Sequence, residues 1–93
     1  MILSKTKRAQ IRKKTKNRCW YCGEDLSGGR MTIDHVQPRS RGGARKCITN
    51  LVPACAACNE DKADMTLDEY QRYCGVRFYG QQWDDHPKEY THE

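Results

Sequence analysis

Residues 19–62 read CWYCGEDLSGGRMTIDHVQPRSRGGARKCITNLVPACAACNEDK, and both ends of this stretch carry the same short motif. Cys19 and Cys22 form one Cys-x-x-Cys pair, and Cys55 and Cys58 form the other. This spacing lets both sulfur atoms of a pair reach a single tetrahedral ion, so the four thiolates are candidate ligands of one structural Zn²⁺. The pattern predicts a small fold that is held together at a metal.

Length and composition favour such a metal-stabilised fold. The chain has 93 residues, 37% of them hydrophobic, and a mean hydropathy of −1.01. A domain of this size buries a modest core, and a bound metal supplies part of the missing stability. We favour zinc over disulfides because the N-terminus lacks an apolar signal sequence. The expected location is intracellular, in the cytoplasm of a bacterium or a phage-infected host cell, without secretion and without a membrane span.

Charge is distributed unevenly along the chain, whose formal net charge is +5. Residues 1–18 carry eight Lys or Arg and no acid, whereas residues 60–93 carry nine acids and four bases. A second basic run, residues 30–46, has five Lys or Arg and one acid. Two basic runs around a candidate metal site predict docking on a polyanion, which we take to be DNA. The candidate contacts are Arg12, Lys13, Lys14, Arg39, Arg41, Arg45 and Lys62.

Composition divides the chain into three segments. Residues 1–18 are a basic arm or helix, residues 19–75 the main domain and residues 76–93 a C-terminal tail that folds back on the core or adds a strand. Within residues 4–17 of the arm, Ser4 is a candidate N-cap, but Ile11 is the only sizeable apolar residue. A single apolar residue does not form a face that could pack on a core. We therefore expect a short helix or an arm that becomes ordered on nucleic-acid phosphates.

The main domain is expected to contain two short strands followed by helix. β-Branched residues favour a strand over residues 30–36, and a second strand over residues 48–53 is expected to stop at Pro53. Residues 56–63 have a composition that favours helix.

A last helix is predicted from the capping box formed by Thr66 and Glu69, and Gly75 is its expected end. Its expected core-facing residues follow helical spacing and are Leu67, Tyr70, Gln71 and Cys74. Cys74 and Cys47 lie outside the cysteine pairs, and we expect both to be partly buried. His86 and His92 are expected to be surface residues.

The candidate catalytic residues lie between and just after the cysteine pairs. His35 is the only histidine in this part of the chain, and an imidazole suits a general base at neutral pH. Asp34 offers a carboxylate oxygen and Asn59 an amide oxygen, which are hard ligands suited to Mg²⁺ or Mn²⁺. Adjacent side chains of a regular strand point to opposite faces, so the strand must end or bend at these residues if Asp34 and His35 serve one site.

Together these residues resemble the HNH endonuclease family. The matching positions are Cys19, Cys22, Asp34, His35, the loop from Pro38 to Gly43, Asn50, Leu51, Cys55, Cys58, Asn59 and Lys62. The resemblance implies a small α+β fold with a ββα-metal core that is treble-clef-like, stapled by a structural zinc and flanked by helices. It also implies that His35 activates water, that Asp34 helps to hold a divalent metal and that Asn50 braces the loop. Asn59 stands at the last family position, which makes this a His-Asn-Asn variant.

The expected function is a metal-dependent DNA endonuclease that hydrolyses phosphodiester bonds. Its expected cofactors are structural Zn²⁺ and catalytic Mg²⁺ or Mn²⁺, and the resemblance implies 3′-OH and 5′-phosphate products. The alternative is a zinc-ribbon-like module that binds nucleic acid without cutting it, which leaves Asp34, His35 and Asn59 without a role. A zinc module that binds protein fits the basic runs poorly. We expect a monomer or a weak dimer.

Overall fold

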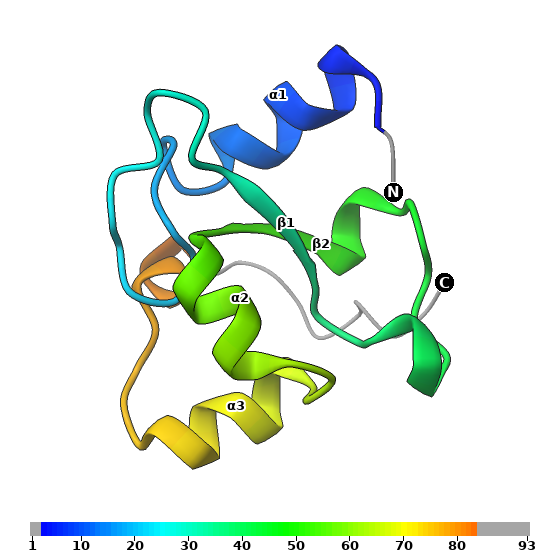
Figure 1. Ribbon diagram of the computed structural model, residues 1–93, viewed down its shortest axis with the longest axis vertical. Coiled ribbons are helices and arrows are strands. Elements are labelled where there is room, and N and C mark those ends of the chain that lie inside the picture. Colours follow the sequence, from blue (N-terminus) through cyan, green and yellow to red (C-terminus); the bar gives the residue numbers. More distant parts are fainter. Residues whose placement is uncertain (1–2, 84–93) are drawn as a thin grey trace.

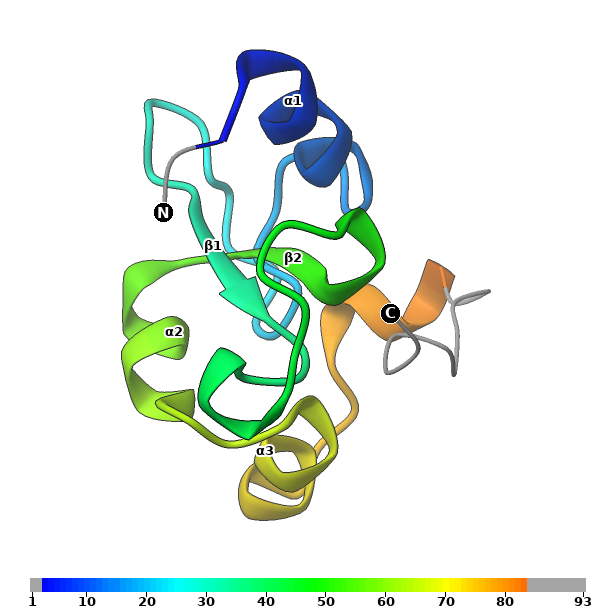
Figure 2. The same cartoon turned by 90° about the vertical axis from the view of Figure 1, so that its right-hand side faces the viewer.

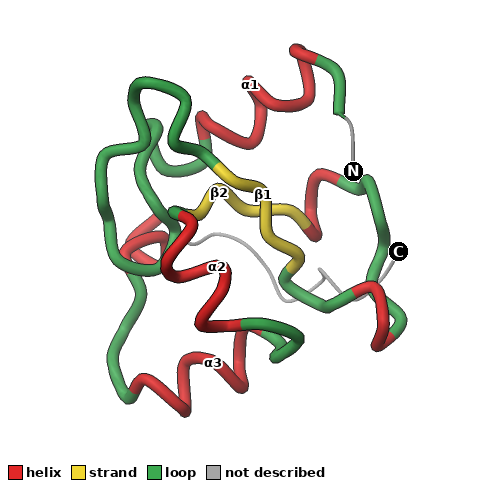
Figure 3. The backbone as a smooth tube through the Cα atoms, in the orientation of Figure 1, coloured by secondary structure: helices red, strands yellow, loops and turns green. Residues whose placement is uncertain are grey.

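A two-stranded antiparallel sheet lies at the centre of the computed structural model, which describes residues 3–83. In the sheet Asp34 faces Val52 and His35 faces Leu51. Figure 3 shows the strands in yellow with the helices around them. The strands are β1 (Thr32–His35) and β2 (Leu51–Ala54), and the α-helices are α1 (Lys5–Lys13), α2 (Ala56–Lys62) and α3 (Leu67–Cys74). The small α+β class is as predicted. No helix within residues 3–83 has the length and apolar character that a membrane crossing requires.

The predicted ββα unit consists of β1, β2 and α2. α2 begins directly after β2, because Cys55 acts as its N-cap and accepts a hydrogen bond at Sγ from the Cys58 N–H at 3.4 Å. The helix then packs against β1, as Figure 1 shows. The second cysteine pair therefore does two things at once: it starts the helix and presents its sulfur atoms at the helix N-terminus.

α1 is docked on the sheet rather than free. The Ser4 hydroxyl accepts a hydrogen bond from the Lys7 N–H at 3.1 Å, which confirms the predicted N-cap. Ile11 is fully buried, and burial of one isoleucine contributes about 1.5–3 kcal/mol. Lys14 adds two hydrogen bonds from Nζ, at 2.6 Å to the Ile48 carbonyl and at 2.7 Å to the Leu51 carbonyl. α1 and α3 lie at opposite ends of the molecule in both ribbon views (Figures 1 and 2).

The second strand differs from its predicted bounds. Residues Ile48–Asn50 form a 3₁₀ turn, η2, and β2 begins only at Leu51. Pro53 lies inside the strand, opposite Ile33, where the prediction ended it. Proline lacks an N–H donor, but it is tolerated there because both strands of a two-stranded sheet are edge strands. The Pro53 carbonyl accepts a hydrogen bond from the Trp20 N–H at 2.8 Å, outside the pairing with β1.

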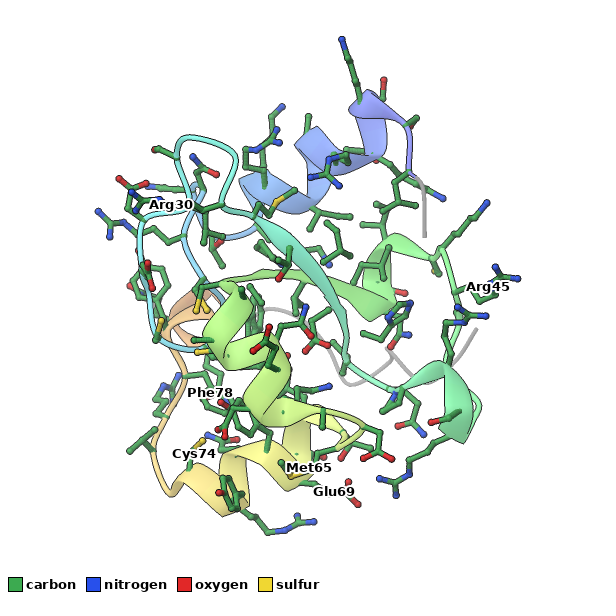
Figure 4. The ribbon with its side chains drawn as sticks, viewed as in Figure 1. Arg30, Arg45, Met65, Glu69, Cys74 and Phe78 are labelled. Carbon is green, nitrogen blue, oxygen red and sulfur yellow. The ribbon has the colours of Figure 1, made fainter. Side chains whose placement is uncertain are left out.

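The last helix begins and ends as predicted. Thr66 and Glu69 form the reciprocal capping box, and Gly75 ends α3 with φ 73°. Leu67 and Tyr70 are buried, but Cys74 is exposed, which corrects the expectation that it faces the core. Figure 4 shows Cys74 on α3. The helix spans eight residues, so only its first turns reach the core.

The chain after α3 folds back onto the first cysteine pair. The Tyr79 N–H donates to the Tyr21 carbonyl at 3.2 Å, and the Gly80 N–H donates to the Trp20 carbonyl at 2.7 Å. Phe78, labelled in Figure 4, is buried in the hydrophobic core. A short 3₁₀ helix, η3 (Tyr79–Trp83), follows. The described part of the tail, residues 76–83, folds back on the core, which is one of the two predicted alternatives, whereas His86 and His92 lie outside the described residues.

Candidate active site and metal centre

The two cysteine pairs converge on one point. The sulfur atoms of Cys19, Cys22, Cys55 and Cys58 all lie within 4.8 Å of one another. Sγ of Cys22 and Sγ of Cys55 are 3.8 Å apart. Zn–S bonds of about 2.3 Å in a tetrahedron place the sulfur atoms about 3.8 Å apart, so the cluster has the size of a ZnS₄ site. The four predicted ligands could therefore hold one zinc ion.

Backbone N–H groups donate to two of these sulfur atoms, Sγ of Cys55, described above, and Sγ of Cys19. Sγ of Cys19 accepts from the N–H groups of Tyr21 and Cys22 at 3.4 and 3.5 Å. Burial acts to raise the pKa of the Cys19 thiol, but these and neighbouring backbone donors outweigh it and hold the pKa below its ordinary value. Burial raises the pKa of Cys22 to about 11. Thiols packed this closely become thiolates together only when a cation neutralises them, which is the chemistry of a metal site.

Asp34 projects from β1 between α2 and the first cysteine pair. Its Oδ2 accepts a hydrogen bond from the Tyr21 hydroxyl and lies 3.2 Å from Nζ of Lys62. Burial, reinforced by the Asp34 carboxylate, raises the pKa of Tyr21 well above its ordinary value, so the phenol keeps its proton and remains a donor. Asp34 is thus held from two sides, by an aromatic residue of the cysteine pair and by a cation of α2.

Asn59 lies one turn before Lys62 on the same side of α2. Its Nδ2 donates to Thr32 Oγ1 at 3.0 Å and to the Ile33 carbonyl at 3.4 Å, so the amide is fastened to β1. Both hydrogen bonds use the nitrogen, which leaves Oδ1 as its possible ligand atom. In the same way, the donors around Asp34 use Oδ2 and leave Oδ1. Carboxylate and amide oxygens are hard ligands of the kind that could hold Mg²⁺ or Mn²⁺.

His35 is the last residue of β1 and is half-buried. Its Nε2 lies 3.1 Å from the backbone carbonyl of Arg45. A carbonyl oxygen only accepts, so this contact assigns the hydrogen to Nε2 and leaves Nδ1 as the basic nitrogen. The loop that follows β1 therefore orients the imidazole and selects its tautomer.

Asp34 and His35 contact different parts of the molecule, as expected for neighbours in a strand. The carboxylate faces Tyr21, and the imidazole faces the loop at Arg45. Lys62 links the two residues, because its Nζ also donates to the His35 carbonyl at 2.8 Å. β1 ends at His35.

Asn50 braces the loop that carries Arg45. Its side chain is fully buried, and Oδ1 accepts from the Gln37 N–H at 2.9 Å. Its Nδ2 donates to the Gln37 carbonyl at 3.1 Å and to the Ala44 carbonyl at 2.9 Å. Gly43 passes so close that a Cβ there would lie 1.7 Å from the Gln37 oxygen, so only glycine fits. The amide thus closes the loop from Gln37 to Ala44, and it sets the position of the Arg45 carbonyl next to it.

Within residues 3–83, the side chains of two arginines of the basic loop, Arg39 and Arg45, form no hydrogen bond or ion pair. Arg39, Ser40, Gly43 and Arg45 line an open hollow of about 540 Å³. Figure 4 shows Arg45 pointing away from the body of the protein. Arg41 is engaged instead, because its Nη2 lies 3.0 Å from Oε2 of Glu69 on α3. Arg39 and Arg45 are therefore the two arginines that line this hollow.

The remaining predicted DNA contacts fall into two groups. Lys13 is exposed and Arg12 is partly exposed on α1, whose Lys7 also bonds the Lys46 carbonyl at 2.7 Å and so brings α1 beside the basic loop. Lys14 and Lys62 turn their ammonium groups inward, to backbone carbonyls and to Asp34. The ammonium groups of these two predicted DNA contacts are therefore engaged within the fold.

Sequence reasoning missed three partners of the site. Tyr21 was not among the candidate site residues, but its hydroxyl reaches Asp34, 13 residues away. The Arg45 carbonyl and the backbone of Gln37 are main-chain groups, which carry no signature in the sequence. The only sequence feature that could have indicated Tyr21 is its position between Cys19 and Cys22.

Comparison with known proteins agrees with this geometry. Residues 19–64 match the family model of the HNH endonucleases. Among solved structures, the chain is similar to the Type II-C Cas9 enzyme from Actinomyces naeslundii, with a TM-score of 0.65 and 24% identity over 82% of this chain and 9% of that one. At this identity the likeness concerns the fold. No curated protein matches the chain. Through residues 19–64, which hold both cysteine pairs, Asp34, His35 and Asn59, the chain belongs to the HNH endonuclease family.

Proposed function

We propose that this protein is a metal-dependent DNA endonuclease in which His35 is the general base. The observation that supports this most directly is the contact between His35 Nε2 and the Arg45 carbonyl. It leaves Nδ1 to accept a proton, and it joins the imidazole to Arg45, a residue that lines the hollow together with Arg39. A base, a phosphate-binding surface and a pair of metal ligands are the parts that phosphodiester hydrolysis requires.

In the proposed mechanism Arg39 and Arg45 hold the DNA backbone in the hollow. Nδ1 of His35 accepts a proton from a water molecule, whose oxygen forms a new bond to phosphorus as the bond to the leaving 3′ oxygen breaks. Oδ1 of Asp34 and Oδ1 of Asn59 would hold Mg²⁺ or Mn²⁺, which when bound stabilises negative charge on the phosphate and on the leaving oxygen. The leaving 3′ oxygen takes a proton from solvent water and His35 releases its proton to solvent, so the expected products carry a 3′-OH and a 5′-phosphate.

The cysteine cluster would hold a structural Zn²⁺ in this proposal. Its four sulfur ligands leave no open position for substrate, which is the arrangement of a structural rather than a catalytic zinc site. Arg12 and Lys13 of α1 would add sequence-independent contacts to phosphates beyond the loop.

The test is cleavage of supercoiled plasmid by zinc-loaded protein with Mg²⁺ or Mn²⁺. His35→Ala is expected to slow cleavage by roughly 10²- to 10⁴-fold, the usual contribution of a positioned base, with DNA affinity little changed. Tyr73→Ala is the matched control, because Tyr73 is 68% exposed on α3, outside the site, and its loss should leave the rate unchanged. Equal rates for wild type and folded His35→Ala would exclude His35 as the base. A wild type that binds DNA and never cuts it would support the non-catalytic binding module.

A further inference from the structure

Tyr21 connects the cysteine cluster to the site of the proposed catalytic metal. It stands between Cys19 and Cys22, and its N–H donates to Sγ of Cys19 at 3.4 Å. Its hydroxyl donates to Oδ2 of Asp34 on β1. Tyr21 and Asp34 are both buried, at 5% and 6% exposure. One residue therefore touches a sulfur ligand with its backbone and a candidate metal ligand with its side chain.

The Tyr21 ring is held tightly enough to set the position of its hydroxyl. Tyr70 meets the ring edge-on with centroids 5.2 Å apart, and Phe78 does the same at 4.9 Å. The Tyr21 carbonyl also accepts the Tyr79 N–H at 3.2 Å. Backbone and ring are thus fixed independently, so the hydroxyl is a preorganised donor rather than a mobile one.

We propose that Tyr21 is a positioning residue for the divalent-metal ligand Asp34, through which the zinc cluster sets the geometry of the catalytic site. This inference rests on the proposed function, because it takes Asp34 as a ligand of Mg²⁺ or Mn²⁺. The terminal torsion of an aspartate is soft, so the carboxylate rotates unless its oxygens are held. Tyr21 and Lys62 both hold Oδ2, which would leave Oδ1 as the ligand atom for the metal. Outer contacts of this kind typically change metal affinity by about 10- to 100-fold.

The test is Mn²⁺ binding to zinc-loaded protein without DNA, measured from the electron paramagnetic resonance signal of free Mn²⁺. Tyr21→Phe keeps the ring and removes only the hydroxyl, and it is expected to raise the Mn²⁺ dissociation constant about 10-fold or more. Tyr70→Phe is the matched control. Its ring lies in the same cluster, but its hydroxyl donates at 2.9 Å to Asp61, so Mn²⁺ binding should equal that of wild type.

Three outcomes decide between the possibilities. If Asp34→Ala weakens Mn²⁺ binding and Tyr21→Phe does not, Tyr21 has no positioning role and the proposed metal ligand stands. If Asp34→Ala binds Mn²⁺ as wild type does, the proposed ligand set is wrong and the role of Tyr21 falls with it. If both Tyr21→Phe and Tyr70→Phe weaken binding equally, the effect is one of general packing, and this also overturns the inference.

A measurement on the wild type covers the case in which Tyr21→Phe loses zinc or fails to fold. In a Mg²⁺ titration followed by NMR, the ring signals of Tyr21 should shift more than those of Tyr70, because only Tyr21 is bonded to Asp34. Tyr21 signals that stay in place while Mg²⁺ binds would overturn the proposal.

Discussion

Lys62 and Asp34 form an ion pair in the interior, with 3.2 Å between Nζ and Oδ2 and side-chain exposures of 1% and 7%. Burial lowers the pKa of Lys62, and the Asp34 carboxylate acts against that shift. The ammonium also donates to the His35 carbonyl, so each partner is satisfied by groups of the fold. A lysine expected to contact DNA thus neutralises a buried carboxylate next to the proposed metal site.

Removal of this cation should destabilise the protein strongly. In Lys62→Met the Asp34 carboxylate stays buried without its partner, and breaking a buried ion pair in this way typically costs about 3–5 kcal/mol. Urea unfolding of the zinc-loaded protein measures the change in the free energy of unfolding. Lys13→Met, at an exposed position of α1, is the control and should change it by less than about 0.5 kcal/mol. Similar losses in both variants would contradict a structural role for the ion pair.

The four clustered cysteines should act as one zinc site. We expect about one Zn²⁺ per purified chain and loss of the fold when any one of the four becomes serine, because binding of a structural zinc supplies folding free energy directly. Metal analysis and circular dichroism provide the measurements. Cys74→Ser is the control, since Cys74 is exposed and lies outside the cluster. A metal-free protein with the same circular dichroism spectrum and stability would refute the zinc site.

Loss of the Asn50 amide should weaken both the fold and the site. Asn50→Ala leaves the Gln37 N–H and the Gln37 and Ala44 carbonyls without their partner, and an unsatisfied buried polar group costs about 1–3 kcal/mol. Thermal unfolding should show the loss. Asn50→Asp retains the acceptor for the Gln37 N–H and loses both donors, so its stability should remain below that of wild type. A wild-type melting temperature for either variant would argue against the bracing role.

The exposed cations of α1 should supply affinity for DNA without choice of sequence. Arg12→Ala combined with Lys13→Ala is expected to weaken binding to all DNA sequences and to flatten the dependence of log K on log salt by about 0.9 per lost phosphate contact. Fluorescence anisotropy at several salt concentrations measures this slope. Lys14→Met is the matched control, because Nζ of Lys14 bonds two backbone carbonyls, and it should leave the slope unchanged. An unchanged slope in the double variant would remove α1 from the DNA surface.

Lys14 should make stability depend on pH in the alkaline range. Burial lowers its pKa from 10.5 to about 8, while the charge of Cys47 acts in the opposite direction. Between these two values the unfolded chain binds more protons than the folded one, so Lys14 contributes stability that increases with pH from about 8 to 10.5. The test compares free energies of unfolding of wild type and Lys14→Met at pH 7, 8, 9 and 10. The advantage of wild type should grow with pH; an advantage that shrinks would reverse the sign of this effect.

Features that depend on neighbours in the sequence were predictable. The capping box at Thr66 and Glu69, the helix end at Gly75 and the N-cap at Ser4 all form as expected. Each joins residues within one or two turns, so residue type and spacing suffice. The convergence of the four cysteines was also predictable, because a tetrahedral ion requires the two pairs to meet.

Burial was predictable only where several residues of one element indicated it. The single apolar residue Ile11 predicted no docking, yet α1 docks because Lys14 adds two hydrogen bonds to β2 and η2. Cys74 follows the apolar spacing of α3 but lies beyond the end of the core. In a domain this small, the extent of the core decides which periodic positions are covered.

The sequence by itself determined the motif, its family and the chemical types that could form a nuclease site: a histidine base, two oxygen ligands and four thiolates. Tertiary structure alone decided what each of these groups faces. Tyr21 meets Asp34 across 13 residues, Lys62 reaches His35 across 27, and the Arg45 carbonyl selects the tautomer of His35. These contacts involve long-range packing and main-chain groups, and their free energy depends on the position of the whole loop or helix rather than on local spacing.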